Sequence, residues 1–249
     1  VNQKGGVGKT TSAINIGAYM AETGKKVLLV DFDSQGNMTS GVGLTKERPT
    51  IYELMIEEKT AAETIKKTSV KNLDAISASI DLAGFSIELV EKVPDEKERV
   101  FFLKNALDPL KNQYDYILID CPPSLGLLTL NALAAADAVI IPMQCEFYSL
   151  EGITQLLNTV EIVRGSINPL LFIEGVVMTM YDGRAKHNKQ VIEEVHTVLG
   201  YLVYDTIIPR QIKLSESASF GTPILFYDKN SRSAKAYLNL AKEVIERGK

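Results

Sequence analysis

The chain has 249 residues, of which 45% are hydrophobic and 23% charged, and this composition suits one substantial globular core. Its formal net charge of −4 excludes binding to nucleic acid through the field of the whole molecule, so any such contact requires a local basic patch. The sequence lacks an apolar run long enough to span a membrane and shows no secretory signal, so we expect neither a transmembrane helix nor a signal peptide.

Apolar runs alternate with helical patterns along the chain, after a glycine-rich loop at residues 4–8. The expected strands are 26–31, 73–76, 116–120, 138–143, 171–180 and 206–209. The expected helices are 10–23, 79–92, 98–112, 125–135, 150–164, 188–199 and 231–247, and Thr60 with Glu63 indicates a capping box that opens a further short helix. The charged segment 45–70 is interpreted as a solvated surface region. This alternation predicts an α/β fold with a mainly parallel twisted sheet and helices on both faces, in a single domain spanning residues 1–249.

The chain begins abruptly for this pattern. A phosphate-binding loop normally follows a buried strand, and only Val1 and Asn2 precede the loop here. We therefore expect a few residues of a first strand to be missing from the N-terminus.

The opening stretch, VNQKGGVGKTT, nearly matches the phosphate-loop pattern G-x-x-x-x-G-K-[ST], but Gln3 replaces the first glycine and Lys4 adds a second lysine. The glycines allow backbone N–H groups to turn toward phosphate oxygens, and the helix that follows adds its dipole. Lys9 is then expected to reach the β- and γ-phosphates, and the Thr10 hydroxyl to bind Mg²⁺. The alternative, a glycine-rich turn with ordinary surface lysines, is disfavoured because a helix and two acidic strand ends accompany the loop.

Carboxylates follow two of the apolar strands. Asp31 and Asp33 end the first in VDFDSQGN, and Asp120 ends another in LIDCPPS. Such a carboxylate can hold Mg²⁺ directly or through water, and a second one can orient an attacking water. Aspartate at a strand end is also a common turn former, and either segment taken alone leaves both interpretations open.

Several motifs resemble one family along essentially the full chain. KGGVGKTT resembles the deviant phosphate loop of the ParA/MinD class of P-loop ATPases, and LLVDFDSQGNMTSGVG and YILIDCPPSLGLLTLNAL resemble the next two motifs of its ParA/Soj branch. The segments IPMQCEFYSLEG, IPRQIKLSESASFGTPILFYD and AYLNLAKEV extend the likeness. The resemblance implies a single-domain P-loop NTPase that hydrolyses ATP with Mg²⁺ in order to partition DNA.

The resemblance also assigns roles to residues. It implies that Lys4 reaches across an ATP-sandwich homodimer to the partner's phosphates, that Lys4, Lys9 and Asp33 are catalytic, and that Asp33 positions the water. Thr11 is expected at the α-phosphate, and Pro209 at the adenine, although a proline there also simply ends a strand. The expected nucleotide-binding residues are Lys4, Gly5, Gly6, Val7, Gly8, Lys9, Thr10, Thr11 and Pro209, and the expected metal site comprises Thr10, Asp33 and Asp120.

The partners implied by the resemblance are nonspecific DNA and a ParB/Spo0J-like centromere-binding protein, in a cytoplasmic, nucleoid-associated setting without a membrane. The DNA-binding residues are expected to be Arg184, Lys186, Lys189 and Lys213. From charge alone, the GRAKHNK run is also compatible with a solvated basic loop.

Three rival functions share the fold. A MinD-like membrane ATPase ends in a basic amphipathic helix, whereas the final helix here has the pattern of one docked on a core. An electron-transfer protein like the nitrogenase iron protein requires cluster-ligating cysteines, whereas Cys121 and Cys145 are interpreted as small buried residues that suit a reducing cytosol. A small-molecule ligase or kinase requires a substrate pocket that the sequence does not identify. The cargo, a chromosome origin or a plasmid, stays open.

Overall fold

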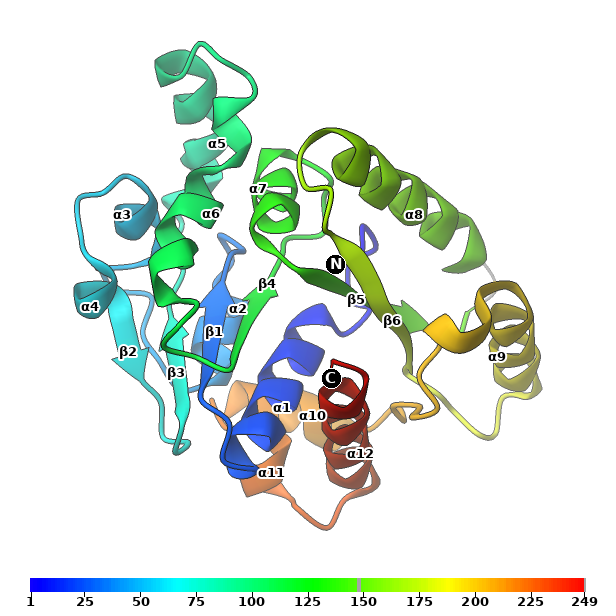
Figure 1. The fold of residues 1–249 in the computed structure, drawn as a ribbon. Helices are drawn as coiled ribbons and strands as arrows, with labels where there is room; N and C mark the ends of the chain where they lie inside the picture. Colours follow the sequence, from blue (N-terminus) through cyan, green and yellow to red (C-terminus); the bar gives the residue numbers. More distant parts are fainter. Residues whose placement is uncertain (147–148, 249) are drawn as a thin grey trace.

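The computed structural model describes the backbone of residues 1–146 and 149–248, and the side chains of these residues apart from 149–151 and Lys186. Figure 1 shows the strands in the middle of the molecule with helices on both sides. The strands are β1 (Val27–Asp31), β2 (Ile65–Lys67), β3 (Leu73–Ile76), β4 (Tyr116–Asp120), β5 (Ala138–Gln144) and β6 (Phe172–Thr179).

The α-helices surround these strands. They are α1 (Lys9–Glu22), α2 (Asn37–Gly41), α3 (Ile51–Met55), α4 (Ala61–Thr64), α5 (Leu82–Lys92), α6 (Phe102–Leu107), α7 (Leu127–Ala135), α8 (Ser149–Ser166), α9 (Lys186–Leu199), α10 (Ile212–Ser219), α11 (Ile224–Tyr227) and α12 (Arg232–Arg247). Short 3₁₀ turns lie at Glu98–Val100, Asp108–Leu110 and Gly200–Leu202.

The first sheet has the strand order β2-β3-β1-β4, in which β1 pairs in parallel with β3 and β4 while β2 is an antiparallel edge. Every residue of β1 is buried. Leu28 and Val30 belong to the core beneath α3, α5, α6 and α7, whereas Val27 and Leu29 belong to the core beneath α1 and α12. Because successive side chains of a strand point to opposite faces, helices cover both sides of this sheet, as the apolar strand pattern predicts.

The second sheet is the parallel pair β5 and β6, packed against α8 and α9. The prediction of a strand at 206–209 is wrong. Among the described residues, this segment forms only an isolated parallel bridge, between Pro209 and Tyr181. It still runs beside β6, since the Ile208 N–H donates to the Met178 carbonyl at 2.8 Å. Proline has no N–H to donate, which limits how far a ladder can extend here.

The N-terminus lies between the two sheets. The amino group of Val1 donates to the Ile140 carbonyl at 2.9 Å, and Asn2 Nδ2 donates to the Pro142 carbonyl at 2.7 Å. A cavity of about 460 Å³ adjoins them, with residues of both β4 and β5 in its wall. The expectation that strand residues precede Val1 stays a prediction.

The segment 45–70 contains more structure than its charge suggests. Ile51, Leu54 and Met55 of α3 are buried in the core, so the interpretation of the whole segment as solvated surface is wrong. Their i, i+3, i+4 spacing is a helical apolar face, too short to stand out among charged neighbours. The capping box of Thr60 and Glu63 is confirmed, and it opens α4.

The helix expected at 98–112 is broken into a 3₁₀ turn, α6 and a second 3₁₀ turn. Pro109 lies at the start of that second turn, where its missing N–H would interrupt a continuous α-helix. The other helices expected from periodicity are present, although α5 begins at Leu82 rather than at residue 79.

Candidate nucleotide-binding site

The glycine-rich loop ends at the N-terminus of α1. Gly6 and Gly8 have φ angles of 74° and 88°, a left-handed conformation that favours glycine. The Gly8 carbonyl accepts the Ser12 N–H at 2.8 Å, the first hydrogen bond of the helix. The preceding N–H groups of the loop and the first helical turn are thus grouped at one helix end, which is the arrangement that binds anions.

Side chains from the second sheet hold this loop in place. Gln144 Nε2, at the end of β5, donates to the Gly6 carbonyl at 2.9 Å. The Thr179 hydroxyl, at the end of β6, donates to the Val7 carbonyl at 2.9 Å. Both strands end at the loop, so the loop is fixed by residues far away in the chain. The sequence pattern does not indicate that these two side chains anchor the loop, although Gln144 lies in the IPMQCE motif.

Lys9, Thr10 and Asp120 come together at the carboxyl end of β4. Burial lowers the pKa of the Lys9 amine, and the nearby Asp120 and Asp33 carboxylates act in the opposite direction. Burial raises the pKa of the Asp120 carboxyl to about 7, whereas a hydrogen bond with the Thr10 side chain acts in the opposite direction. The other carboxylate oxygen, Oδ2, has no hydrogen-bond partner among the described residues. A buried, half-satisfied carboxylate beside a hydroxyl is a donor set that fits a hard divalent cation such as Mg²⁺.

Asp31 has a structural role that its spacing from Asp33 does not reveal. It is fully buried, and its Oδ2 accepts hydrogen bonds from the Thr39 N–H at 2.7 Å and the Thr39 hydroxyl at 2.6 Å. The Thr39 hydroxyl oxygen in turn accepts the Ala78 N–H at 3.0 Å. Asp31 therefore ties the end of β1 to α2 and to the end of β3. Thr39 is buried at this junction, and the sequence pattern does not indicate its role.

Asp33 lies in the loop after β1 and is only partly buried. Its Oδ1 accepts the Gln35 N–H at 3.0 Å, and its charge acts on both Lys9 and Asp120. A partly solvated carboxylate of this kind can orient a water molecule, and this role of Asp33 stays a prediction. The structure separates two carboxylates only two residues apart: Asp31 is buried and tied to Thr39, whereas Asp33 is partly exposed.

Lys4 lies on the surface at the edge of this site. Its Nζ donates to Glu146 Oε2 at 2.6 Å, and both side chains are about half exposed. Ion pairs as exposed as this one contribute only about 0–1 kcal/mol to the stability of a folded protein. The amine can therefore leave Glu146 for another partner at a small cost in free energy. Lys9 Nζ, in contrast, turns inward to the Lys4 carbonyl at 3.2 Å. The two lysines of the loop thus point to different surroundings.

Two further predicted nucleotide contacts lie near the loop. Thr11 is in the first turn of α1, where its carbonyl accepts a hydrogen bond from Asn15 Nδ2 at 2.8 Å. Pro209 is brought to the carboxyl end of β6 by its bridge with Tyr181. The roles of Thr11 at the α-phosphate and of Pro209 at the adenine stay predictions.

The predicted basic patch is formed by two segments that lie side by side. Arg210 N–H donates to the Tyr181 carbonyl at 2.9 Å, which places the 209–213 segment against the loop that carries Asp182 and Arg184. The Arg184 guanidinium donates to both oxygens of Asp182 at 3.0 and 2.8 Å, holding the pKa of that carboxyl down at about 2, and Arg210 adds to the effect.

The other lysines of the predicted patch differ in their surroundings. Lys213 is paired with Asp228, and Lys189 is exposed on α9. The side chain of Lys186 lies outside the described residues. Arg210, in the 209–213 segment, is also exposed and is not among the residues predicted from the sequence. The patch therefore carries carboxylates among its cations, a feature that the basic run alone does not show.

Both cysteines are buried, and burial raises the pKa of each thiol to about 12, as expected for inert packing residues. Among the described helices, none is both long and apolar enough to cross a membrane.

Known proteins resemble this chain over nearly its full length. Residues 1–173 match a family model described as an AAA domain. The sporulation initiation inhibitor protein Soj of Bacillus subtilis (strain 168) is 53% identical over 249 residues, covering 99% of this chain and 97% of that protein. The chromosome-partitioning ATPase Soj of Treponema pallidum (strain Nichols) is 53% identical over 247 residues, covering 99% and 96%.

A solved structure has the same architecture. Cobyrinic acid a,c-diamide synthase from Mycobacterium smegmatis, with bound ATP analogue and magnesium, superposes with a TM-score of 0.87 at 35% identity. The match covers 100% of this chain and 93% of that one. The mainly parallel P-loop fold expected from the sequence is therefore confirmed.

Proposed function

Because the chain belongs to the Soj/ParA family of chromosome-partitioning ATPases, we propose that it is a DNA-segregation ATPase whose ATP-bound homodimer binds DNA without sequence preference. Hydrolysis, stimulated by a ParB-like centromere-binding partner, resets the dimer. The observation that carries this proposal is the meeting of Lys9, Thr10 and Asp120 at the N-terminus of α1. We place the protein in the cytoplasm, associated with the nucleoid.

The proposed ligands are ATP and Mg²⁺. The loop N–H groups and Lys9 bind the phosphates, while Thr10 and Asp120 hold the metal ion, with Asp120 acting through water. The orphaned Asp120 Oδ2 supports this assignment, as does the ATP analogue with magnesium in the M. smegmatis structure. The bound metal ion supplies neutralisation of phosphate charge. Asp33 orients the attacking water from the side of the loop, and Lys9 stabilises charge on the phosphoryl oxygens.

The proposed dimer uses Lys4 to complete the partner's site. In this structure the Lys4 amine donates a hydrogen bond to Glu146 of its own chain. On dimerisation the amine leaves this carboxylate and binds the phosphate oxygens of the ATP in the partner's site. The exchange adds a cation to the transition state only when two chains meet, which makes hydrolysis dependent on dimerisation.

The helix α12 bears on the MinD-like alternative. Its apolar residues Tyr237, Leu240 and Ala241 are buried, and they belong to the same core as α1. Its apolar face is thus used inside the fold, which supports the partitioning function over a function that employs this helix as a membrane anchor.

The experiment that tests the proposal is ATP turnover measured alone, with nonspecific DNA, and with DNA plus a candidate centromere-binding protein. We expect slow basal turnover that rises at least tenfold when both are present. A rate that responds to neither, or that requires a small-molecule acceptor, would overturn the proposed function in favour of a ligase or kinase.

The proposed DNA surface comprises Arg184, Lys186, Lys189 and Lys213. Replacing both Arg184 and Lys213 by glutamate is expected to abolish DNA binding near physiological salt, because these side chains would contact the phosphates of the DNA backbone. ATP-driven dimerisation is expected to persist, because neither residue is proposed to contact the bound ATP. Alanine at either position is expected to make the fall of log affinity with log salt concentration less steep, by about 1 in slope for each lost phosphate contact. Binding is measured by fluorescence anisotropy with ATP and Mg²⁺ over a salt series.

A matched control uses two basic residues outside the proposed patch. Arg164 on α8 is paired with Glu161 much as Arg184 is paired with Asp182, and Lys71 is exposed. The double change of Arg164 and Lys71 to glutamate alters the net charge equally and is expected to weaken DNA binding far less. Equal losses in the two double variants would mean that net charge, not the proposed patch, controls binding.

A further inference from the structure

Helix α5 has two apolar faces. Leu82, Phe85 and Leu89 point into the core, where the Phe85 ring packs edge-on against Tyr52 and Phe102 at centroid distances of 6.0 Å. A second set of apolar residues faces solvent. Its members are Ile80, Ala83, Ile87 and Val90, and the exposed fractions of the three larger ones are 67%, 65% and 54%. A helix that already has a buried face needs no second apolar face for its own folding.

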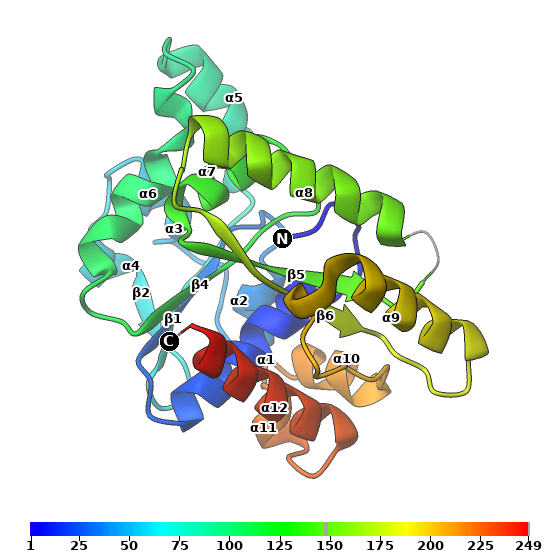
Figure 2. The same cartoon turned by 45° about the vertical axis from the view of Figure 1, so that its right-hand side comes forward.

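The spacing of the exposed set is regular. Residues 80, 83, 87 and 90 follow the 3-4-3 pattern with which helices pair along a narrow seam. Ile80 lies in the turn that leads into α5, where its carbonyl accepts the Ala83 N–H at 2.9 Å. The helix stands at the edge of the molecule in both views (Figures 1 and 2). Single exposed apolar residues are ordinary on protein surfaces, whereas a row of them, here three on α5 and one in the turn before it, is typical of an interaction surface.

The charge around this seam is acidic. Residues 80–98 contain six acidic side chains and two basic ones. Asp81 and Glu88 have cationic neighbours in Arg48 and Lys92. Glu91, Asp95 and Glu96 are exposed and form no ion pair within the described part of the chain. An occupant with basic side chains beside its apolar seam therefore complements this surface, whereas a second copy of the chain would bring the same acidic segment to it.

The Ile80 end of the seam adjoins the loop that follows Asp33. A cavity of about 510 Å³ lies there, and its lining includes Ile80, Asp81, Ser34 and Gln35, of which the last two directly follow Asp33. The amine of Lys46 donates to the Gln35 carbonyl from the opposite wall. Contact at Ile80 thus occurs beside the loop that carries Asp33.

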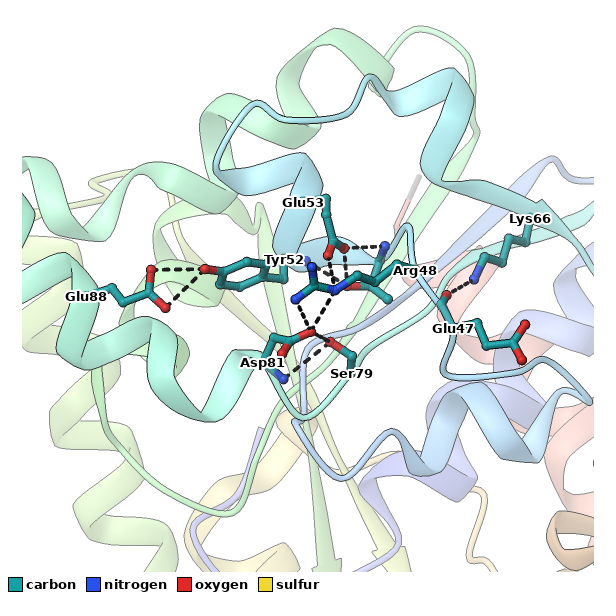
Figure 3. Close-up of polar contacts among 9 residues, drawn as sticks. Glu47, Arg48, Tyr52, Glu53, Lys66, Ser79, Asp81 and Glu88 are labelled. Atoms are coloured by element: carbon teal, nitrogen blue, oxygen red, sulfur yellow. Dashed lines mark hydrogen bonds and ion pairs between the residues drawn. The ribbon is translucent and has the colours of Figure 1, made fainter.

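Hydrogen bonds and ion pairs hold the base of α5 in one position. Figure 3 shows the Arg48 guanidinium between two carboxylates, with distances of 3.0 Å to Asp81 Oδ2 and 2.9 Å to Glu53 Oε1. The Ser79 hydroxyl also donates to Asp81 Oδ2 at 2.9 Å. One residue earlier in the chain, the Ala78 N–H bonds to Thr39, which bonds to Asp31. The segment that leads into α5 is therefore connected through Thr39 to Asp31, and it lies beside the residues that follow Asp33.

We propose that the exposed seam of α5 is the docking surface for an amphipathic helix with basic flanks, supplied by the protein partner that stimulates hydrolysis. Docking there displaces Ile80 and the 33–36 loop relative to the phosphate loop and so alters the position of Asp33. The inference rests on the proposed function for its regulatory consequence, but the binding surface can be tested without it.

The binding test uses a labelled synthetic peptide, helical and amphipathic, with leucines on its seam and lysines on its flanks. A second peptide has the same seam with glutamates on its flanks. Fluorescence anisotropy with the full chain is expected to show tighter binding of the lysine peptide. The double variant Ile87→Gln/Val90→Gln is expected to bind it at least tenfold more weakly, because seam contacts dominate such interfaces. Ile162→Gln on α8 is the matched control, since Ile162 is 68% exposed, and it is expected to bind normally.

A charge-reversal variant distinguishes specific docking from nonspecific apolar binding of the peptide. Glu91→Lys is expected to weaken binding of the lysine peptide and to strengthen binding of the glutamate peptide. Equal affinity of both peptides for the wild type, or of the lysine peptide for wild type and the seam double variant, would overturn the docking surface. Loss of self-association in the seam variant, seen by sedimentation without any effect on peptide binding, would assign the surface to a second copy instead.

The regulatory consequence has its own readout. The seam double variant is expected to keep the basal ATPase rate and ATP-driven dimerisation while losing at least tenfold of the partner-stimulated rate. Stimulation equal to that of the wild type would overturn the inference and leave the proposed function intact. Absence of ATP turnover in the wild type would instead overturn the proposed function, whatever the peptides show.

Discussion

Replacing Asp33 by alanine is expected to slow ATP hydrolysis about 100-fold or more, because an orienting or proton-accepting carboxylate contributes that much to a hydrolytic step. ATP binding and ATP-dependent dimerisation should persist, since the phosphate contacts come from the glycine loop and Lys9 rather than from Asp33. The structure supports this separation: Asp33 is partly exposed, and among the described residues its carboxylate accepts one hydrogen bond, from the Gln35 N–H. Single-turnover hydrolysis by preformed dimers is the measurement, and a wild-type rate would contradict the assignment.

The Asp33→Asn variant distinguishes a catalytic role of the Asp33 carboxylate from a role in shaping the loop after β1. An asparagine oxygen can still accept the Gln35 N–H, so the loop after β1 is expected to keep its shape. If the carboxylate itself orients the water, the asparagine variant stays slow. Recovery of the wild-type rate by asparagine would show that Asp33 acts only by shaping the loop.

Lys9→Ala is expected to weaken ATP binding about 10- to 100-fold, the loss that follows when a charged hydrogen bond of about 1.5–3 kcal/mol is removed. Lys4→Ala, in contrast, is expected to leave the ATP affinity of the monomer close to that of the wild type and to abolish the ATP-dependent dimer. The structure gives the reason for the difference, because Lys9 turns into the loop while Lys4 faces outward to Glu146. Nucleotide titration and sedimentation with ATP and Mg²⁺ measure the two effects.

Glu146→Gln controls for a structural role of Lys4. It removes the carboxylate that holds the Lys4 amine in this structure but keeps the amine itself. If Lys4 acts on the partner's phosphates, this variant still dimerises with ATP. A loss of the dimer in Glu146→Gln equal to that in Lys4→Ala, or normal dimerisation of Lys4→Ala, would show that the proposed role across the dimer is wrong.

The sequence by itself determined the features that depend on neighbouring residues. The phosphate loop, the apolar strands β1, β3, β4, β5 and β6, and the capping box at Thr60 are each specified by residues a few positions apart. Glycine supplies the left-handed turns at Gly6 and Gly8, and the apolar run Val27–Val30 of β1 predicts helices on both faces of the strand. The likeness of these motifs to one family also indicated the nucleotide fold before any geometry was known.

Only the tertiary structure decided which site residues are buried and which groups they contact. The family resemblance selected Asp33 for the water, but the strand pattern alone does not show that Asp31 is buried against Thr39 while Asp33 lies beyond the end of the strand. The partner of Lys4 is Glu146, 142 residues away, and the loop anchors come from the ends of β5 and β6.

Burial was likewise decided by the tertiary structure. Charged neighbours conceal the apolar face of α3, which the core nevertheless covers, whereas the apolar seam of α5 is left in solvent. Local sequence fixes which backbone conformations and turns are favourable, because those energies act between near neighbours. Which carboxylate is desolvated, and which apolar face is covered, depends on segments that meet only when the chain has folded.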